Sequence, residues 1–111
     1  MSRHDPATVL QQIVECCEEV ASLMEDADNP VFAENRLLEL AVLRLLEMIG
    51  EAVTRLPEEF RSQHLEVPWG EVVGLRNRLI HGYDSVDLDI VERIVSEDLP
   101  DLLKKVREIS P

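Results

Sequence analysis

Aromatic residues, glycines and long apolar runs are all scarce in this sequence. Only 4% of its 111 residues are aromatic and only four are glycine, so an aliphatic core is expected. Runs of β-branched residues with a period of two are absent, which excludes a large sheet and predicts an all-α fold. No apolar run approaches the ~20 residues that span a bilayer, and the first residues lack the apolar segment of a signal peptide. We therefore expect a cytoplasmic protein with no membrane contact.

Basic residues are also scarce. The chain has 11 lysines and arginines against 23 acidic residues, a formal net charge of −12. Broad electrostatic binding to nucleic acid needs a basic surface, so a contact with RNA would rely on a local positive site or on a second chain. The acidic surface suits a basic protein partner, but solubility explains the charge equally well. The adjacent Cys16 and Cys17 indicate small residues at the core edge and a reducing compartment, since a disulfide between them would be strained.

The apolar spacing predicts a bundle of four to five helices in one domain that covers residues 1–111. Asp5-Pro6 has the composition of a helix start, and Asn29-Pro30 is expected to start a second, long helix over residues 32–56 in the same way. A further helix is expected from residue 68 to a glycine at position 82. Asp87 is expected to cap the next helix, and Pro100 either kinks it or starts a new one.

The long helix is apolar on two sides. Besides its main stripe it carries a second one, formed by Leu37, Leu40, Leu43 and Met48. Only a narrow polar line remains, which consists of Arg44, Glu47, Glu51 and Arg55. A helix of this kind in a small domain has more apolar surface than its own core can cover. We interpret the second stripe as the interface of a two-fold homodimer. The alternative is that both stripes pack inside a four-helix monomer.

Arg76 lies where a leucine would be expected. It follows Val72 and precedes Ile80 by four residues each, which places it on the apolar face of the helix expected over residues 68–82. His81 follows five positions later, about 140° away around a regular helix, whereas Asn77 and His81 face the same way. Three arrangements would allow Arg76 and His81 to act together. The helix could unwind near its end, the long arginine side chain could extend around the helix to the histidine, or a second chain could complete the site.

An arginine beside a histidine is sufficient for RNA cleavage without a metal or cofactor. The guanidinium of Arg76 suits a phosphate, and the imidazole of His81 can exchange a proton at neutral pH. In this reading the histidine takes the 2′-hydroxyl proton and the arginine stabilises the charge on phosphorus. The structural alternative is that Arg76 pairs with a core carboxylate such as Glu51 and that His81 only caps a helix. No cluster has metal-ligand spacing, and no Ser/His/Asp arrangement is evident.

Residues 76–83 read Arg-Asn-Arg-Leu-Ile-His-Gly-Tyr. This segment resembles the Arg-x4-His-x-Tyr motif of HEPN-domain toxins, specifically the HepT-like family. Three further segments resemble the family in order and spacing, namely Ile49-Gly50-Glu51-Ala52, Val67-Pro68-Trp69 and Asp98-Leu99-Pro100. The resemblance covers about residues 29 to 109.

The resemblance implies an up-and-down HEPN-like bundle that dimerises, with a composite site of Arg and His from both protomers. It implies a metal-independent endoribonuclease toxin of a type VII pair that cleaves tRNA or mRNA. The implied partner is an MNT-type nucleotidyltransferase antitoxin that transfers AMP onto Tyr83 and so blocks the site. The alternative for Tyr83 is that its ring simply covers the helix end.

The motif also suggests a role for each candidate residue. Arg76 would be the phosphate clamp and His81 the general acid and base. Asn77 would orient His81 or the phosphate, Arg78 would be a further phosphate-binding residue, and Glu51 would hold Arg76 in place.

One position departs from the family pattern. Asp84, directly after the tyrosine, replaces a residue that is often bulky in relatives. Together with the net charge, this acid favours a rival hypothesis in which the chain is a non-catalytic helical module that binds a nucleotidyltransferase and helps to position its nucleotide or substrate. A third hypothesis is a purely structural dimerisation bundle.

Overall fold

The computed structural model describes residues 5–81 and 85–110, and its helices confirm the all-α prediction. The elements in chain order are α1 (Pro6–Asp26), the 3₁₀-helix η1 (Phe32–Glu34), α2 (Arg36–Thr54), α3 (Glu58–Ser62), α4 (Trp69–Val73), α5 (Leu75–Leu79), β1 (Ile80–His81), β2 (Ser85–Val86), α6 (Leu88–Arg93), the π-helix η2 (Ile94–Asp98) and α7 (Leu99–Ile109). Within the described part of the chain, none of the helices is long and apolar enough to cross a membrane.

Helix α1 starts where its caps predict. The Asp5 carboxylate accepts a hydrogen bond from the Thr8 backbone N–H at 3.4 Å, and Pro6 occupies the first turn. Helix α2 starts later than predicted, because Asn35 rather than Asn29 is its cap and accepts from the Leu38 N–H at 3.1 Å. The segment that Asn29-Pro30 was expected to start forms the separate turn η1, whose Phe32 side chain is buried.

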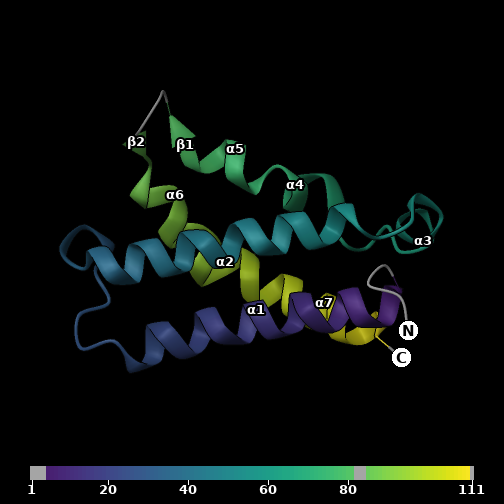
Figure 1. Ribbon diagram of the computed structural model, residues 1–111, viewed down its shortest axis with the longest axis horizontal. Helices are drawn as coiled ribbons and strands as arrows, with labels where there is room; N and C mark the ends of the chain where they lie inside the picture. Colours follow the sequence, from purple (N-terminus) through teal and green to yellow (C-terminus); the bar gives the residue numbers. More distant parts are fainter. Residues whose placement is uncertain (1–4, 82–84, 111) are drawn as a thin grey trace.

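Helix α2 is the centre of the molecule (Figure 1). It packs against α1 on one side and against α4 and α5 on another, and α7 packs on α1. Gly50 allows the close approach of α4, since a Cβ at this position would lie 3.1 Å from the Val72 carbonyl oxygen. Helix α4 therefore rests on the C-terminal part of α2 through a contact between two backbones.

The helix expected over residues 68–82 is interrupted and ends early. Helix α4 stops at Gly74, whose N–H bonds the Gly70 carbonyl, and α5 begins one residue later. Glycine is the weakest helix former after proline, and the break lets the chain follow the surface of α2. Helix α5 ends at Leu79, so the expectation that the helix continues to Gly82 is wrong.

The final helices form one bent rod. Asp87 caps α6 as predicted, with its carboxylate accepting from the N–H groups of Asp89 and Ile90 at 3.0 and 3.2 Å. The π turn η2 lies between α6 and α7, and its last bond runs from the Leu99 N–H to the Ile94 carbonyl. Pro100 has no N–H for a regular helical bond, which accounts for a widened turn at this point. The proline therefore bends a helix that continues as α7.

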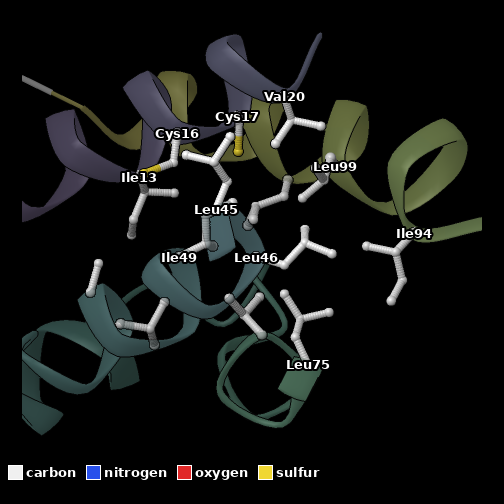
Figure 2. Close-up of a cluster of buried hydrophobic side chains, with 14 of the residues drawn as sticks. Ile13, Cys16, Cys17, Val20, Leu45, Leu46, Ile49, Leu75, Ile94 and Leu99 are labelled. Carbon is white, nitrogen blue, oxygen red and sulfur yellow. The ribbon is translucent and has the colours of Figure 1, made fainter. Parts of the chain in front are cut away.

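The core is aliphatic, as the composition predicts (Figure 2). Figure 2 shows Ile13, Val20, Leu46, Ile49 and Leu99 converging from three helices, and all are buried. Both cysteines are free thiols and are buried within this cluster. Burial raises the pKa of each thiol, that of Cys17 to about 12, so neither is a ready nucleophile.

Candidate active site

The motif segment is held by α5 and a short hairpin. Leu75 and Leu79 are almost fully buried and anchor α5 in the core. Residues 80–81 then pair antiparallel with residues 85–86, with Ile80 opposite Val86 and His81 opposite Ser85. The Asp87 N–H closes the hairpin by donating to the Leu79 carbonyl at 3.0 Å. Figure 1 shows this hairpin beside the start of α6, at the end of the molecule away from α3.

The two predicted catalytic residues lie on different elements. Arg76 belongs to the single turn α5 and His81 to strand β1, and their side chains lie outside what the structure describes. The predicted angle of 140° between them assumed a regular helix through residue 81. That assumption is wrong because the helix ends at Leu79. For the same reason, Asn77 and His81 do not share one helix face.

The side chains of Asn77 and Arg78 are exposed. Arg78 Nη2 lies 3.4 Å from the Asp98 carboxylate of η2, and both side chains are about two-fifths exposed. This contact places Arg78 on the side of α5 that faces η2 and α7. It lines a small hollow of about 90 Å³ there with Asp98 and Asp101. The partner Asp98, 20 residues further along, is the contact that sequence reasoning missed.

Glu51 is not a core carboxylate, which the structural alternative for Arg76 assumed, whereas its role in holding Arg76 stays a prediction. Its side chain is 62% exposed, and Oε1 lies 3.9 Å from Arg44 Nη1. It lines a groove between α2 and α1, together with Arg55, Glu15 and Glu19. Gly50, one position earlier, faces α4, so Glu51 is turned by about 100° from the side that carries the motif. Tyr83 and the adjoining Asp84 lie outside the described residues.

The described residues leave most of the second stripe of α2 exposed. Leu37 is 80% exposed, Leu40 47% and Met48 38%, whereas Leu43 is half-buried. Arg44 and Glu51 lie on the same side, which we call the α2 outer face and define by Leu37, Leu40, Arg44, Met48 and Glu51. The alternative in which both stripes pack inside a monomer is therefore wrong. Within the described residues, no three His, Cys, Asp or Glu side chains form a group suited to a metal ion.

Comparison with known proteins identifies the family. Residues 13–109 match the family described as Ribonuclease HepT-like. The chain belongs to the HepT-like ribonuclease family. This membership confirms the family predicted from the motif, the HEPN-like bundle, and the class of enzyme, a ribonuclease.

Three relatives illustrate how closely this HepT-like chain matches the family. A protein of Methanocaldococcus jannaschii named "Putative RNase MJ1380" is 41% identical, with 96% of this chain and 97% of the relative covered. "Putative RNase TTE0752" of Caldanaerobacter subterraneus is 38% identical over 94% of this chain and 93% of the relative. "Probable ribonuclease HepT" of Thermococcus cleftensis is 34% identical over 90% and 91%. None of the solved structures matches the chain significantly.

Proposed function

We propose that this HepT-like chain is a metal-independent endoribonuclease toxin of a type VII HEPN/MNT pair, with residues 1–111 as one domain. The observation that carries the proposal is the spacing Arg76-x4-His81-x-Tyr83 in a chain that matches the family over residues 13–109. The substrate is RNA, either tRNA or mRNA, because only RNA carries the 2′-hydroxyl on which the chemistry depends.

The proposed reaction is an internal phosphoryl transfer. His81 takes the proton of the 2′-hydroxyl, and the 2′-oxygen attacks the neighbouring phosphorus. The bond from phosphorus to the 5′-oxygen breaks, and the leaving oxygen receives a proton from the imidazolium. Arg76 binds the phosphate and stabilises the charge of the transition state. Asn77 is exposed and can orient the phosphate, and Arg78, also exposed, can bind it with the guanidinium N–H groups that do not face Asp98.

A homodimer would complete this site. The exposed leucines of the α2 outer face support the proposal, since contiguous apolar surface on a soluble protein marks an interaction site. Leu37→Glu is expected to convert the dimer into a monomer in sedimentation or light-scattering measurements. Leu65→Glu is the matched control, because Leu65 is 79% exposed but lies in the loop before α4. If the Leu37→Glu protein still has the mass of a dimer in solution, the α2 outer face is excluded as the interface.

Mixing two inactive variants tests whether the site is shared between protomers. Arg76→Ala and His81→Ala homodimers are each expected to be inactive. Their heterodimer regains one intact site if Arg76 of one protomer works with His81 of the other. No recovery in a heterodimer whose formation has been verified would place both residues of each site on one chain.

Regulation by a partner is the second part of the proposal. An MNT-type nucleotidyltransferase antitoxin would transfer AMP onto Tyr83, and the added phosphate and nucleoside would occupy the cleft and repel RNA. Intact mass after co-expression is expected to show one added AMP on the wild type and none on Tyr83→Phe. Addition to both proteins would place the modification elsewhere.

The net charge of −12 favours one rival, a non-catalytic module that binds the nucleotidyltransferase. Expression without the partner separates the two proposals. Growth arrest that Arg76→Ala abolishes, and that the exposed control Arg93→Ala retains, supports the toxin. No arrest by soluble wild-type protein supports the module.

A further inference from the structure

An apolar groove runs between α1 and the bent rod formed by α6, η2 and α7. Cys17, Val20 and Met24 line it from α1, and Val95, Leu99 and Leu103 line it from the rod. The hollow has a volume of about 420 Å³ and no charged side chain in its described lining. Figure 2 shows three of these lining residues, with Cys17 and Val20 on α1 near Leu99 of α7.

The groove continues beyond Met24 toward η1 and α6. A second hollow of about 430 Å³ shares Met24 and Val95 with the first, and Val31, Phe32 and Leu88 also line it. Val31 is 47% exposed at its edge. The two hollows together form an elongated channel, which fits an extended or helical segment better than a compact small molecule.

The charges along this channel have one sign. Asp89 and Glu92, both exposed on α6, are the only charged side chains in the described lining of the two hollows. A segment that enters the channel therefore meets apolar side chains first and carboxylates at the end formed by α6.

The channel is separate from the surfaces discussed above. The groove beside α2 that Glu51 lines involves Gln12, Cys16 and Glu19 of α1, whereas the channel involves Cys17, Val20 and Met24. An occupant would therefore leave the α2 outer face free for a second copy. It would nevertheless contact α6 and η2, whose Asp98 is bound to Arg78 of α5.

We propose that this channel binds an amphipathic helix of a different protein, with an apolar stripe along the floor and lysines or arginines against Asp89 and Glu92. The apolar lining supplies the affinity, as in other complexes of a helix in a groove, and Met24 adapts its shape to the side chains of the partner. The acidic end selects a basic partner and fixes the direction in which its helix lies. The proposal does not depend on whether the chain cleaves RNA.

Binding of designed peptides tests the channel. The probe is a fluorescent helix of about 18 residues, ~27 Å long, with leucines on one face and lysines on the others. Ala21 lines the channel and is exposed, whereas the adjacent Ser22 is exposed and does not line it. Ala21→Arg is expected to weaken binding at least tenfold. Ser22→Arg, which adds the same charge one residue away, is expected to leave the affinity within twofold of wild type.

A second pair of variants tests the role of charge. The double variant Asp89→Asn/Glu92→Gln is expected to weaken binding about tenfold and to reduce its dependence on salt. The control Glu58→Gln/Glu59→Gln removes the same charge from the exposed α3 and is expected to have little effect. Equal binding of a leucine–glutamate peptide would overturn the proposed basic partner. Equal binding to Ala21→Arg and Ser22→Arg, or no binding to wild type, would overturn the channel as a docking site.

Discussion

The close approach of α4 to α2 at Gly50 can be tested through protein stability. A Cβ at residue 50 would lie 3.1 Å from the Val72 carbonyl oxygen and 3.6 Å from that of Val73. Valine adds two further methyl groups at this contact, so the two helices must separate. Overpacking of this kind costs about 1–3 kcal/mol. We expect Gly50→Val to lower the free energy of unfolding by that amount, which shifts the urea midpoint by about 1 M.

Gly70 provides the matched control. It also lies in a helix, α4, but nothing lies within 4 Å of a Cβ at this position. Gly70→Ala is therefore expected to raise the free energy of unfolding by up to ~1 kcal/mol, the usual gain from replacing a helical glycine. Urea denaturation at one fixed protein concentration measures both changes. A Gly50→Val protein as stable as wild type would refute the argument that α4 requires a glycine on α2.

Three further predictions concern single side chains. Burial raises the pKa of Cys17 from 9.0 to about 12, so the thiol ionises at a lower pH in the unfolded chain than in the folded one. The free energy of unfolding should therefore fall by about 1 kcal/mol between pH 8 and pH 10. Cys17→Ala should reduce this pH dependence, and an unchanged pH dependence would contradict the raised pKa of Cys17. Trp69 donates its indole N–H to the carbonyls of Arg61 and His64 at 3.1 and 3.0 Å, so Trp69→Phe should cost about 1 kcal/mol in urea denaturation. Asp87→Ala removes the cap of α6 and should cost about 1 kcal/mol, most of which Asp87→Ser should restore.

The parts of the fold that could be predicted depend on local signals. The cap and proline at Asp5-Pro6 and the cap at Asp87 act within one helical turn, so the sequence alone identifies them. The start of α2 could not be predicted in this way, because Asn29 and Asn35 are equally good caps. The burial of Phe32 favours a separate turn between them.

The motif segment shows where local signals fail. A single glycine such as Gly74 costs a helix only ~1 kcal/mol and is often tolerated. Here the break accompanies the packing of α4 on Gly50, a contact between residues more than 20 positions apart. Hence the end of the helix at Leu79, and with it the separation of Arg76 and His81 onto two elements, could not be read from spacing.

The same reasoning applies to the supporting charges. The pairing of Arg78 with Asp98 depends on how η2 lies against α5. Whether Glu51 is buried depends on which face of α2 meets α1, and the sequence offered two apolar stripes as candidates. The exposure of the second stripe among the described residues agrees with its excess over the core, which the helical spacing of apolar residues indicates, whereas its role as a dimer interface stays a prediction.

Cleavage of RNA in the presence of EDTA tests the central claim most directly. Purified wild type, His81→Ala and the control His64→Ala are compared on the same RNA, since His64 lies in the loop before α4 and near Glu66. The account predicts that wild type and His64→Ala cleave, and that His81→Ala is slower by about 10²–10⁴, the usual contribution of a general acid and base. Equal rates for wild type and His81→Ala, whether high or negligible, would contradict it.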